Sequence, residues 1–275
     1  MNPSSPHFEI HLRIDTDQVS AVEHLASASG LSHARVKQLM GQGAVWQSRA
    51  GHTQRLRRAS RRMRAGDELH LYHDERVLRQ TPPAARLIAD EGEFSVWYKP
   101  PGMWSQGSKW GDHCTITRWA ERHLRPQRNA LLVHRLDRAA GGLILLAHSK
   151  SMARSLSRLF QERRVEKRYR VRVQGRFPAK PSPYLIDERL DGRFARTRVE
   201  RREFDPQAKS SLLELVIETG RKHQIRRHLA AMGFPVVGDR LYGQPEGPSG
   251  LELTAVELSF HHPVSGRRMR YRLSG

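Results

Sequence analysis

The stretch LLVHRLDRAAGGLILLAHSK, residues 131–150, places an aspartate between two apolar runs. Residues 131–133 and 143–147 each have the length of a buried strand. A carboxylate beside such strands is disfavoured, because desolvation raises its pKa and an unpaired buried charge costs several kcal/mol. Asp137 therefore needs either a structural partner or a chemical role.

Two interpretations of Asp137 are open at this level. As a structural residue it would cap a helix or form an ion pair with Arg135 or Arg138. As a functional residue it would belong to a site. The pair Gly141-Gly142 favours this second interpretation slightly, because paired glycines let a backbone or a ligand approach closely.

Residues 151–175, SMARSLSRLFQERRVEKRYRVRVQG, predict a helix followed by a strand. Apolar residues recur at helical spacing up to Phe160, after which the period changes to two. Tyr169 shares the inward face of this strand with two valines, while arginines point the other way. Tyr169 is either a core residue or an aromatic ring that stacks on a nucleic-acid base.

Residues 211–243, SLLELVIETGRKHQIRRHLAAMGFPVVGDRLYG, predict a strand over 212–218 and then a helix that Gly233 ends. Basic side chains crowd the start of this helix, and such donors suit phosphate or carboxylate partners. These side chains are Arg221, Lys222, His223, Arg226 and Arg227.

The two histidines of this helix do not predict a metal site. His223 and His228 are five residues apart, which is about 140° of rotation around a helix. No cysteine or nearby carboxylate completes a ligand set. We therefore expect no metal here.

Residues 19–40 predict two short helices, the first stopped by Gly30 and the second capped by Ser32. Residues 31–46 (LSHARVKQLMGQGAVW) and 63–72 (MRAGDELHLY) resemble the alpha-L RNA-binding module known from ribosomal protein S four. The resemblance implies that this part of the chain binds RNA.

An arginine cluster follows the second helix, with seven arginines and no acid in residues 48–64. We interpret it as a contact with a nucleic-acid backbone, the alternative being a solvated loop. The candidate RNA contacts in this part of the chain are Arg35, Lys37, Arg57, Arg58 and Arg61. Pro82-Pro83 favour stiff, extended backbone, so residues 77–93 are expected to be a linker.

The composition of the whole chain limits its class. The 275 residues carry 48 Lys and Arg against 28 Asp and Glu, a formal net charge of +20. Such a surplus faces solvent and attracts polyanions, nucleic acid above all, although a basic surface without a partner is the plainer alternative. One cysteine, Cys114, excludes an internal disulfide. No apolar stretch approaches the ~20 residues that span a bilayer, so we expect a cytoplasmic protein without membrane association.

Three motifs resemble, in their order, those of the RluA family of RNA pseudouridine synthases. They are HRLDRAAGGL (134–143), KRYRVRVQG (167–175) and TGRKHQIRRHLAAMGFPVVGDRLYG (219–243). In addition, WYKPPGMWSQG (97–107) is similar to the family's early N-K-P-x-G strand and turn, with Tyr98 in place of asparagine. The alpha-L module also occurs in this family.

The resemblance implies roles for individual residues. The family's catalytic aspartate falls on Asp137, its stacking tyrosine on Tyr169, and the arginine that pairs with the aspartate on Arg226. Arg135 matches the residue that helps to displace the target base. The further substrate contacts expected in this part of the chain are His134, Arg221 and His223.

Besides Tyr98, the chain departs from the family pattern at two further places. The usual D-x-x-T-S-G has Ala140 and Gly141 at the positions of its hydroxyl residues, and a late L-H-A element has Thr254 in place of histidine. Both departures bear on substrate choice or on the hydrogen bonding of the loop, and they leave the chemistry intact.

The resemblance implies an enzyme that converts specific uridines of ribosomal or transfer RNA to pseudouridine, with Asp137 as nucleophile and no cofactor. The carboxylate could attack the sugar or the base, or deprotonate the sugar. It would stay ionised despite burial because Arg226 lies beside it. A glycoside hydrolase is disfavoured, since no second carboxylate accompanies Asp137 in these motifs.

We expect an α+β fold with a central mixed, largely antiparallel sheet and flanking helices, acting as a monomer with RNA as its partner. The expected domains are an RNA-binding module (1–76), the linker and a catalytic domain (94–275). A non-catalytic RNA-binding or ribosome-assembly factor that keeps the fold is the main alternative. A DNA-binding regulator built on the first helix pair is a third, which leaves the second half of the chain unexplained.

Overall fold

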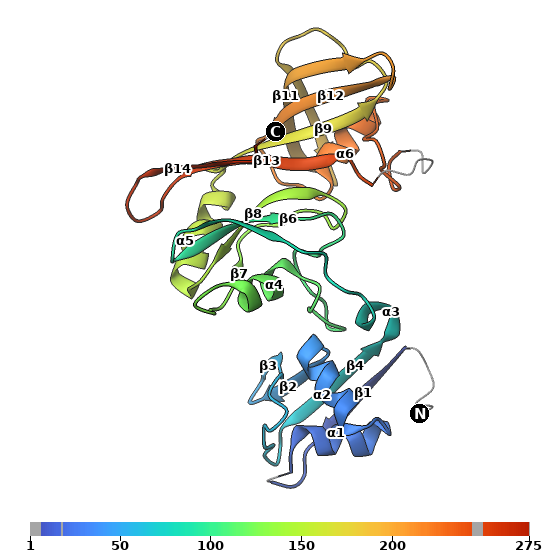
Figure 1. The fold of residues 1–275 in the computed structure, drawn as a ribbon, viewed down its shortest axis with the longest axis vertical. Coiled ribbons are helices and arrows are strands. Elements are labelled where there is room, and N and C mark those ends of the chain that lie inside the picture. The colour runs from blue at the N-terminus through green and yellow to red at the C-terminus, as the bar shows by residue number, and fades with distance from the viewer. Residues whose placement is uncertain (1–6, 18, 244–249, 275) are drawn as a thin grey trace. The chain divides into compact units, whose positions relative to one another are not determined.

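The computed structural model describes residues 7–17, 19–243 and 250–274 (Figure 1). The chain divides into two compact units, of which one contains Met1–Pro82 and Gln106–Trp119 and the other the remaining residues. The segment Gln106–Trp119 thus packs with the N-terminal unit, although the sequence predicts a domain that runs unbroken from residue 94. None of the helices in the described residues is long and apolar enough to cross a membrane.

The N-terminal unit packs short helices against a four-stranded antiparallel sheet of order β1-β4-β2-β3. Its helices are α1 (Ala21–Ser29), α2 (His33–Gln42) and α3 (Glu75–Leu78). Its strands are β1 (His7–Arg13), β2 (Val45–Arg49), β3 (His52–Arg55) and β4 (Glu68–Asp74). The predicted caps are confirmed, since the Ser32 hydroxyl accepts the Arg35 N–H and Gly30 ends α1 in the left-handed conformation.

An acidic side chain ties Gln106–Trp119 to this unit. The Asp112 carboxylate pairs with Arg57 and with Arg55, whose Nε lies 3.2 Å from Oδ2. The Trp46 indole N–H also donates to the backbone carbonyl of Lys109 at 3.0 Å. Part of the arginine cluster is therefore used inside the unit. Its first two residues end strand β2, and residues 52–55 form strand β3 rather than a loop.

The second unit is built on a ten-stranded mixed sheet in which, among the described strands, β8 and β13 form a parallel pair and the rest pair antiparallel. The expected fold class is confirmed. The strands are β5 (Arg86–Asp90), β6 (Phe94–Lys99), β7 (Leu131–Leu132), β8 (Gly141–Ala147), β9 (Glu166–Gln174), β10 (Tyr184–Leu190), β11 (Arg193–Asp205), β12 (Ser210–Ile217), β13 (Leu253–His261) and β14 (Arg268–Arg272). Its helices are α5 (Lys150–Gln161) and α6 (Gln224–Ala231). Helix α4 (Ile116–His123) is divided between the two units after Trp119.

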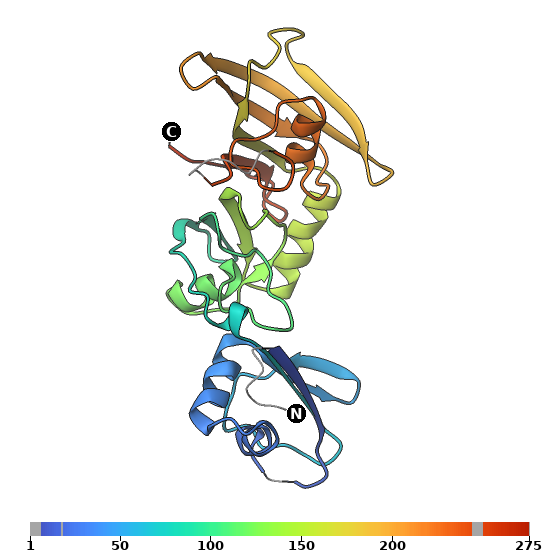
Figure 2. The same cartoon turned by 90° about the vertical axis from the view of Figure 1, so that its right-hand side faces the viewer.

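Helices α5 and α6 cover different parts of this sheet (Figure 2). The apolar face of α5 packs on β6 and β8 in one core cluster, and α6 lies against β10 and β11. The predicted change of period after α5 is confirmed, because Tyr169 is buried on β9 together with its two valine neighbours. Residues 77–93, expected to be a linker, contain the end of α3 and all of β5.

Candidate active site

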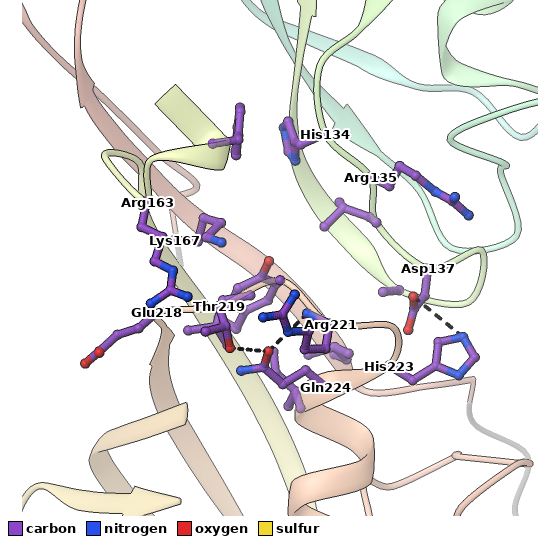
Figure 3. Close-up of a pocket in the computed structure, with 18 of the residues that line it drawn as sticks. His134, Arg135, Asp137, Arg163, Lys167, Glu218, Thr219, Arg221, His223 and Gln224 are labelled. Atoms are coloured by element: carbon purple, nitrogen blue, oxygen red, sulfur yellow. Dashed lines mark hydrogen bonds and ion pairs between the residues drawn. The ribbon is translucent and has the colours of Figure 1, made fainter. Parts of the chain in front are cut away.

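A pocket of about 760 Å³ opens in the second unit, where the turn before β8, strand β9 and the start of α6 converge (Figure 3). Pockets of this size hold small organic ligands. Seven residues singled out from the sequence line it: Asp137, Tyr169, Arg226, Arg135, His134, Arg221 and His223. Segments far apart in the chain therefore meet at one cavity.

Buried polar contacts hold the turn that carries Asp137. The Lys99 ammonium donates to the carbonyls of Ala140 at 2.7 Å and Arg138 at 3.4 Å, and also to two carbonyls of its own loop. The Ser105 hydroxyl donates to the Leu136 carbonyl at 2.7 Å and accepts its N–H at 3.0 Å. Burial lowers the pKa of Lys99 to about 7, and the Asp137 carboxylate opposes this shift.

These contacts supply the hydrogen bonding that was in question at Ala140 and Gly141. The backbone N–H of Ala140 donates to the Asp137 carbonyl at 3.2 Å, which closes the turn. A side chain at position 141 would begin 3.1 Å from the Tyr98 hydroxyl and 3.3 Å from Pro101. Tyr98 therefore fills the space that a larger residue would need, so two of the departures from the family pattern fit together.

Arg226 is shared between two carboxylates. Its Nε and Nη2 donate to Asp239 at 2.7 and 2.6 Å, a bidentate pair in which the Asp239 side chain is fully buried. Its third nitrogen, Nη1, lies 3.3 Å from the Asp137 Oδ2. Asp239 also accepts the backbone N–H groups of Leu241 and Tyr242. Arg226 is thus held rigidly by Asp239 and presents its free edge to Asp137.

Asp137 itself lies at the surface of the pocket rather than inside the core. Its side chain is 24% exposed, so the expected burial is wrong and solvent contributes to its hydration. The His223 Nε2 lies 3.8 Å from Oδ1, while its Nδ1 is 3.0 Å from the Tyr242 hydroxyl. Burial lowers the pKa of His223, and the Asp137 carboxylate opposes the shift.

Tyr169 lies on the floor of the pocket and is 7% exposed. Burial, and after it the Asp137 carboxylate, raises the pKa of its hydroxyl far above the ordinary value. The phenol is therefore neutral at physiological pH. Its ring forms part of the pocket wall, as the inward position on β9 predicts.

The other candidates surround the cavity. His134 stacks on Phe160 with ring centroids 4.3 Å apart, and its Nε2 accepts the Leu145 N–H, so the neutral ring carries its proton on Nδ1. Burial lowers the pKa of His134 to about 3. Arg135 is exposed at the rim, and the Arg221 Nε donates to the Phe194 carbonyl at 3.0 Å.

The two histidines near α6 have separate surroundings. His228 is buried with its Nδ1 3.0 Å from the Thr197 hydroxyl, whereas His223 faces the pocket. Among the described residues, no group of three or more His, Cys, Asp or Glu side chains is placed to hold a metal ion.

The candidate RNA contacts of the N-terminal unit differ in whether their charges are already paired within the fold. Arg35 pairs with Glu75 at 2.8 Å and Arg57 with Asp112, so both charges are partly used within the fold. Arg58 and Arg61 are exposed and line a second, basic pocket of about 340 Å³. Lys37 is exposed on α2.

Sequence reasoning missed two residues of the site. Asp239 stands in the quoted stretch GDRLYG without an assigned role, and Lys99 in the quoted stretch YKPPG. The signal available for Asp239 was a lone acid next to glycine in a very basic chain. No local pattern indicates that its partner would be Arg226, 13 residues earlier.

The fold and this pocket define a class of RNA-modifying enzyme. A family model described as RNA pseudouridylate synthase matches residues 93–231. The chain belongs to this family, and within it to the RluA group, as its relatives indicate. It is therefore an isomerase that acts on RNA.

The relatives are bacterial enzymes of the same kind. A dual-specificity RNA pseudouridine synthase RluA of Vibrio cholerae is 34% identical, over 71% of this chain and 78% of its own length. Its counterpart of Escherichia coli K12 is 31% identical over 68% and 91%. An uncharacterized RNA pseudouridine synthase of Aquifex aeolicus is 26% identical over 96% and 92%.

Solved structures share the fold at lower identity. Human RNA pseudouridylate synthase domain containing 1 matches with a TM-score of 0.59, over 71% of this chain and 86% of that one, at 22% identity. The human domain containing 4 matches with a TM-score of 0.55. These matches show that the chain has the pseudouridine synthase fold.

Proposed function

We propose that this protein isomerises specific uridines of ribosomal or transfer RNA, with Asp137 as the nucleophile and without a cofactor. The observation that supports this most directly is the placement of Asp137 in a pocket with Arg226 3.3 Å away and with Tyr169 in the wall. A pure RNA-binding surface has no need of a carboxylate, because carboxylates repel phosphates.

The reaction needs few groups from the protein. The C1′–N1 bond of uridine breaks, the detached uracil turns, and a C1′–C5 bond forms, while the proton on C5 is replaced by one on N1. Asp137 would form the covalent intermediate, and Arg226 would orient its carboxylate. Tyr169 would stack on the detached base and hold it near the sugar. Because the Tyr169 phenol is neutral, it would take up the C5 proton only while its own proton moves to water, and so would act as a relay.

The target nucleotide has to leave its stack to reach Asp137, which costs a few kcal/mol. Base stacking contributes about 1–3 kcal/mol per base, so Tyr169 offsets much of this cost. Arg135 is exposed at the rim of the pocket and would occupy the space that the extruded base leaves. His223 and Arg221 would contact the same nucleotide from the α6 side.

The N-terminal unit would bind RNA as an alpha-L-like module. Arg58, Arg61 and Lys37 are exposed and suited to backbone phosphates. Arg35 and Arg57 already have carboxylate partners, so we give them a smaller share of RNA binding. The protein would act as a monomer.

Mass-spectrometric mapping of pseudouridine tests this function. RNA from cells that lack the protein should lose pseudouridine at defined positions, and the purified protein, treated with a chelator, should restore it at the same uridines. An unchanged map in those cells, together with no product from the purified protein on their RNA, would contradict the proposal.

A further inference from the structure

The pocket is longer than the region around Asp137. Figure 3 shows Arg163 and Lys167 on one side of the cavity, with Asp137 and His223 on the opposite side. Neither the isomerisation steps nor the family motifs assigned above give these two cations a role. Both line the same pocket as Asp137.

Arg163 stands at a position that normally favours glycine. Helix α5 ends at Gln161, and the next turn is a Schellman motif, since the Arg163 N–H donates to Phe160 and the Arg164 N–H to Leu159. Arg163 has a φ of +58°, in the left-handed region that is unfavourable for a residue with a side chain. A strained non-glycine residue that faces a cavity suggests a functional reason for its side chain.

Lys167 lies two residues before Tyr169 on β9, and both therefore face the pocket. Its ammonium makes no hydrogen bond or ion pair with any described residue, although the residue is half-buried. Burial and the nearby Arg163 lower the pKa of Lys167 to about 8. A half-buried cation beside a second cation favours the arrival of an anion.

Glu218, a carboxylate that also lines the pocket, does not neutralise this pair. Glu218 lies 3.6 Å from the Arg196 guanidinium, and its carboxylate points away from the cavity in Figure 3. The Arg163 guanidinium likewise has no carboxylate partner among the described residues. Two neighbouring cationic side chains of the pocket lining are thus left without a carboxylate partner among the described residues.

We propose that Arg163 and Lys167 form a binding subsite for one backbone phosphate of the RNA, next to the nucleotide that enters the pocket. The proposal rests on the proposed function, because that function makes RNA the ligand. A phosphate held there would fix the direction of the strand through the pocket and keep the extruded uridine over Asp137. The subsite would act on RNA binding rather than on bond breaking.

Arg163→Gly separates this role from a structural one. Glycine suits the left-handed backbone, so the variant should melt at the wild-type temperature or above it. Its KM for RNA should rise about tenfold, the effect of losing one charged hydrogen bond, with kcat at saturating RNA near the wild-type value. Arg164→Ala is the matched control, because it removes the same charge from an exposed neighbour that does not line the pocket.

The probe for binding is a fluorescein-labelled hairpin RNA with uridines in its loop, titrated at several salt concentrations. Arg163→Gly and Lys167→Ala should each reduce the slope of log K against log salt by about 1, and Lys167→Arg should restore it. If Arg163→Gly binds this RNA like Arg164→Ala, the subsite is wrong, whether or not Lys167→Ala folds.

The two proposals can fail separately. If the wild-type protein binds the hairpin but forms no pseudouridine in any RNA, the proposed function fails, while the comparison of Arg163→Gly with Arg164→Ala still decides the subsite. If the wild-type protein binds no RNA, both proposals fail.

Discussion

At the scale of single residues, the charge balance of the site depends on one guanidinium between two acids. Asp239 binds Arg226 through two hydrogen bonds of 2.6 and 2.7 Å, and Asp137 receives the third nitrogen at 3.3 Å. The shorter contacts are to the fully buried acid. Asp239 therefore fixes the position of Arg226, and Arg226 in turn stabilises the charge on Asp137.

Replacement of Asp239 should affect both folding and turnover. Asp239→Ala leaves a buried guanidinium with one partner, which costs about 3–5 kcal/mol of unfolding free energy. Asp239→Asn keeps the shape and should cost less, yet it should lower kcat at least about tenfold because Arg226 is no longer held. Urea denaturation and single-turnover assays measure the two effects. Wild-type kcat in Asp239→Asn would show that Arg226 needs no such support.

His134 should make the stability of the protein depend on pH. Its folded pKa of about 3 lies below the ordinary value of about 6.5. As the pH falls below about 6.5, the unfolded chain takes up a proton that the folded chain does not, so the unfolding free energy decreases by up to about 1.4 kcal/mol per pH unit.

The test of His134 compares two pH profiles. Urea denaturation of the wild type between about pH 6.5 and 4 should show a steeper loss than that of His134→Gln, which can still accept the Leu145 N–H. Lys167 is the charged group that opposes protonation of His134. Parallel profiles for the two proteins would show that His134 does not have the lowered pKa in the folded protein.

At the scale of elements, the start of β8 shows why two adjacent glycines are not equivalent. A Cβ on Gly142, at a φ of +122°, would lie 2.3 Å from the backbone nitrogen of Ala255, where β8 pairs with β13. A Cβ on Gly141 would lie 3.1 Å from the Tyr98 hydroxyl and 3.3 Å from Pro101, so small shifts of these side chains would accommodate it. Gly142 therefore permits the close contact between β8 and β13, whereas Gly141 leaves space for no more than a methyl group.

The two glycines predict different stabilities for a matched pair of variants. Gly142→Ala should push β13 away from β8 and cost about 4 kcal/mol or more, a melting-temperature loss of roughly 10 °C. Gly141→Ala should change the melting temperature by no more than a few degrees. Scanning calorimetry compares them. Equal melting temperatures would mean that β8 and β13 do not meet as described.

Patterns within one element were predictable from the sequence. The period of two placed Tyr169 on the inner face of β9, and the Ser32 and Gly30 caps followed from local chemistry. Contacts between distant segments were not predictable, because no local period encodes them. Asp112 on Arg57 and Lys99 on Ala140 are examples, since each joins residues at least 41 positions apart.

At the scale of the whole molecule, the charge of +20 should make RNA binding strongly dependent on salt. Internal pairing reduces the number of cations available, as Arg35 and Arg57 illustrate. Lys37, Arg58 and Arg61 of the N-terminal unit are exposed and therefore available to bind phosphates. Their contribution should be electrostatic and independent of sequence.

Neutralising Lys37, Arg58 and Arg61 together should therefore weaken binding without affecting the chemistry. Each lost phosphate contact reduces the slope of log K against log salt by about 0.7–0.9, so the triple variant should lose roughly 2–3. Its kcat at saturating RNA should stay near the wild-type value. Anisotropy titrations and turnover assays check this. If kcat fell while the affinity for RNA stayed unchanged, these residues would belong to the active site instead.

In the proposed reaction, the Asp137 carboxylate is the nucleophile. The most direct measurement is pseudouridine formation by Asp137→Asn under single-turnover conditions, with RNA affinity measured on the same sample. We predict wild-type affinity or better, because a negative charge near phosphates is removed, and no detectable pseudouridine. Wild-type turnover by Asp137→Asn would contradict the account.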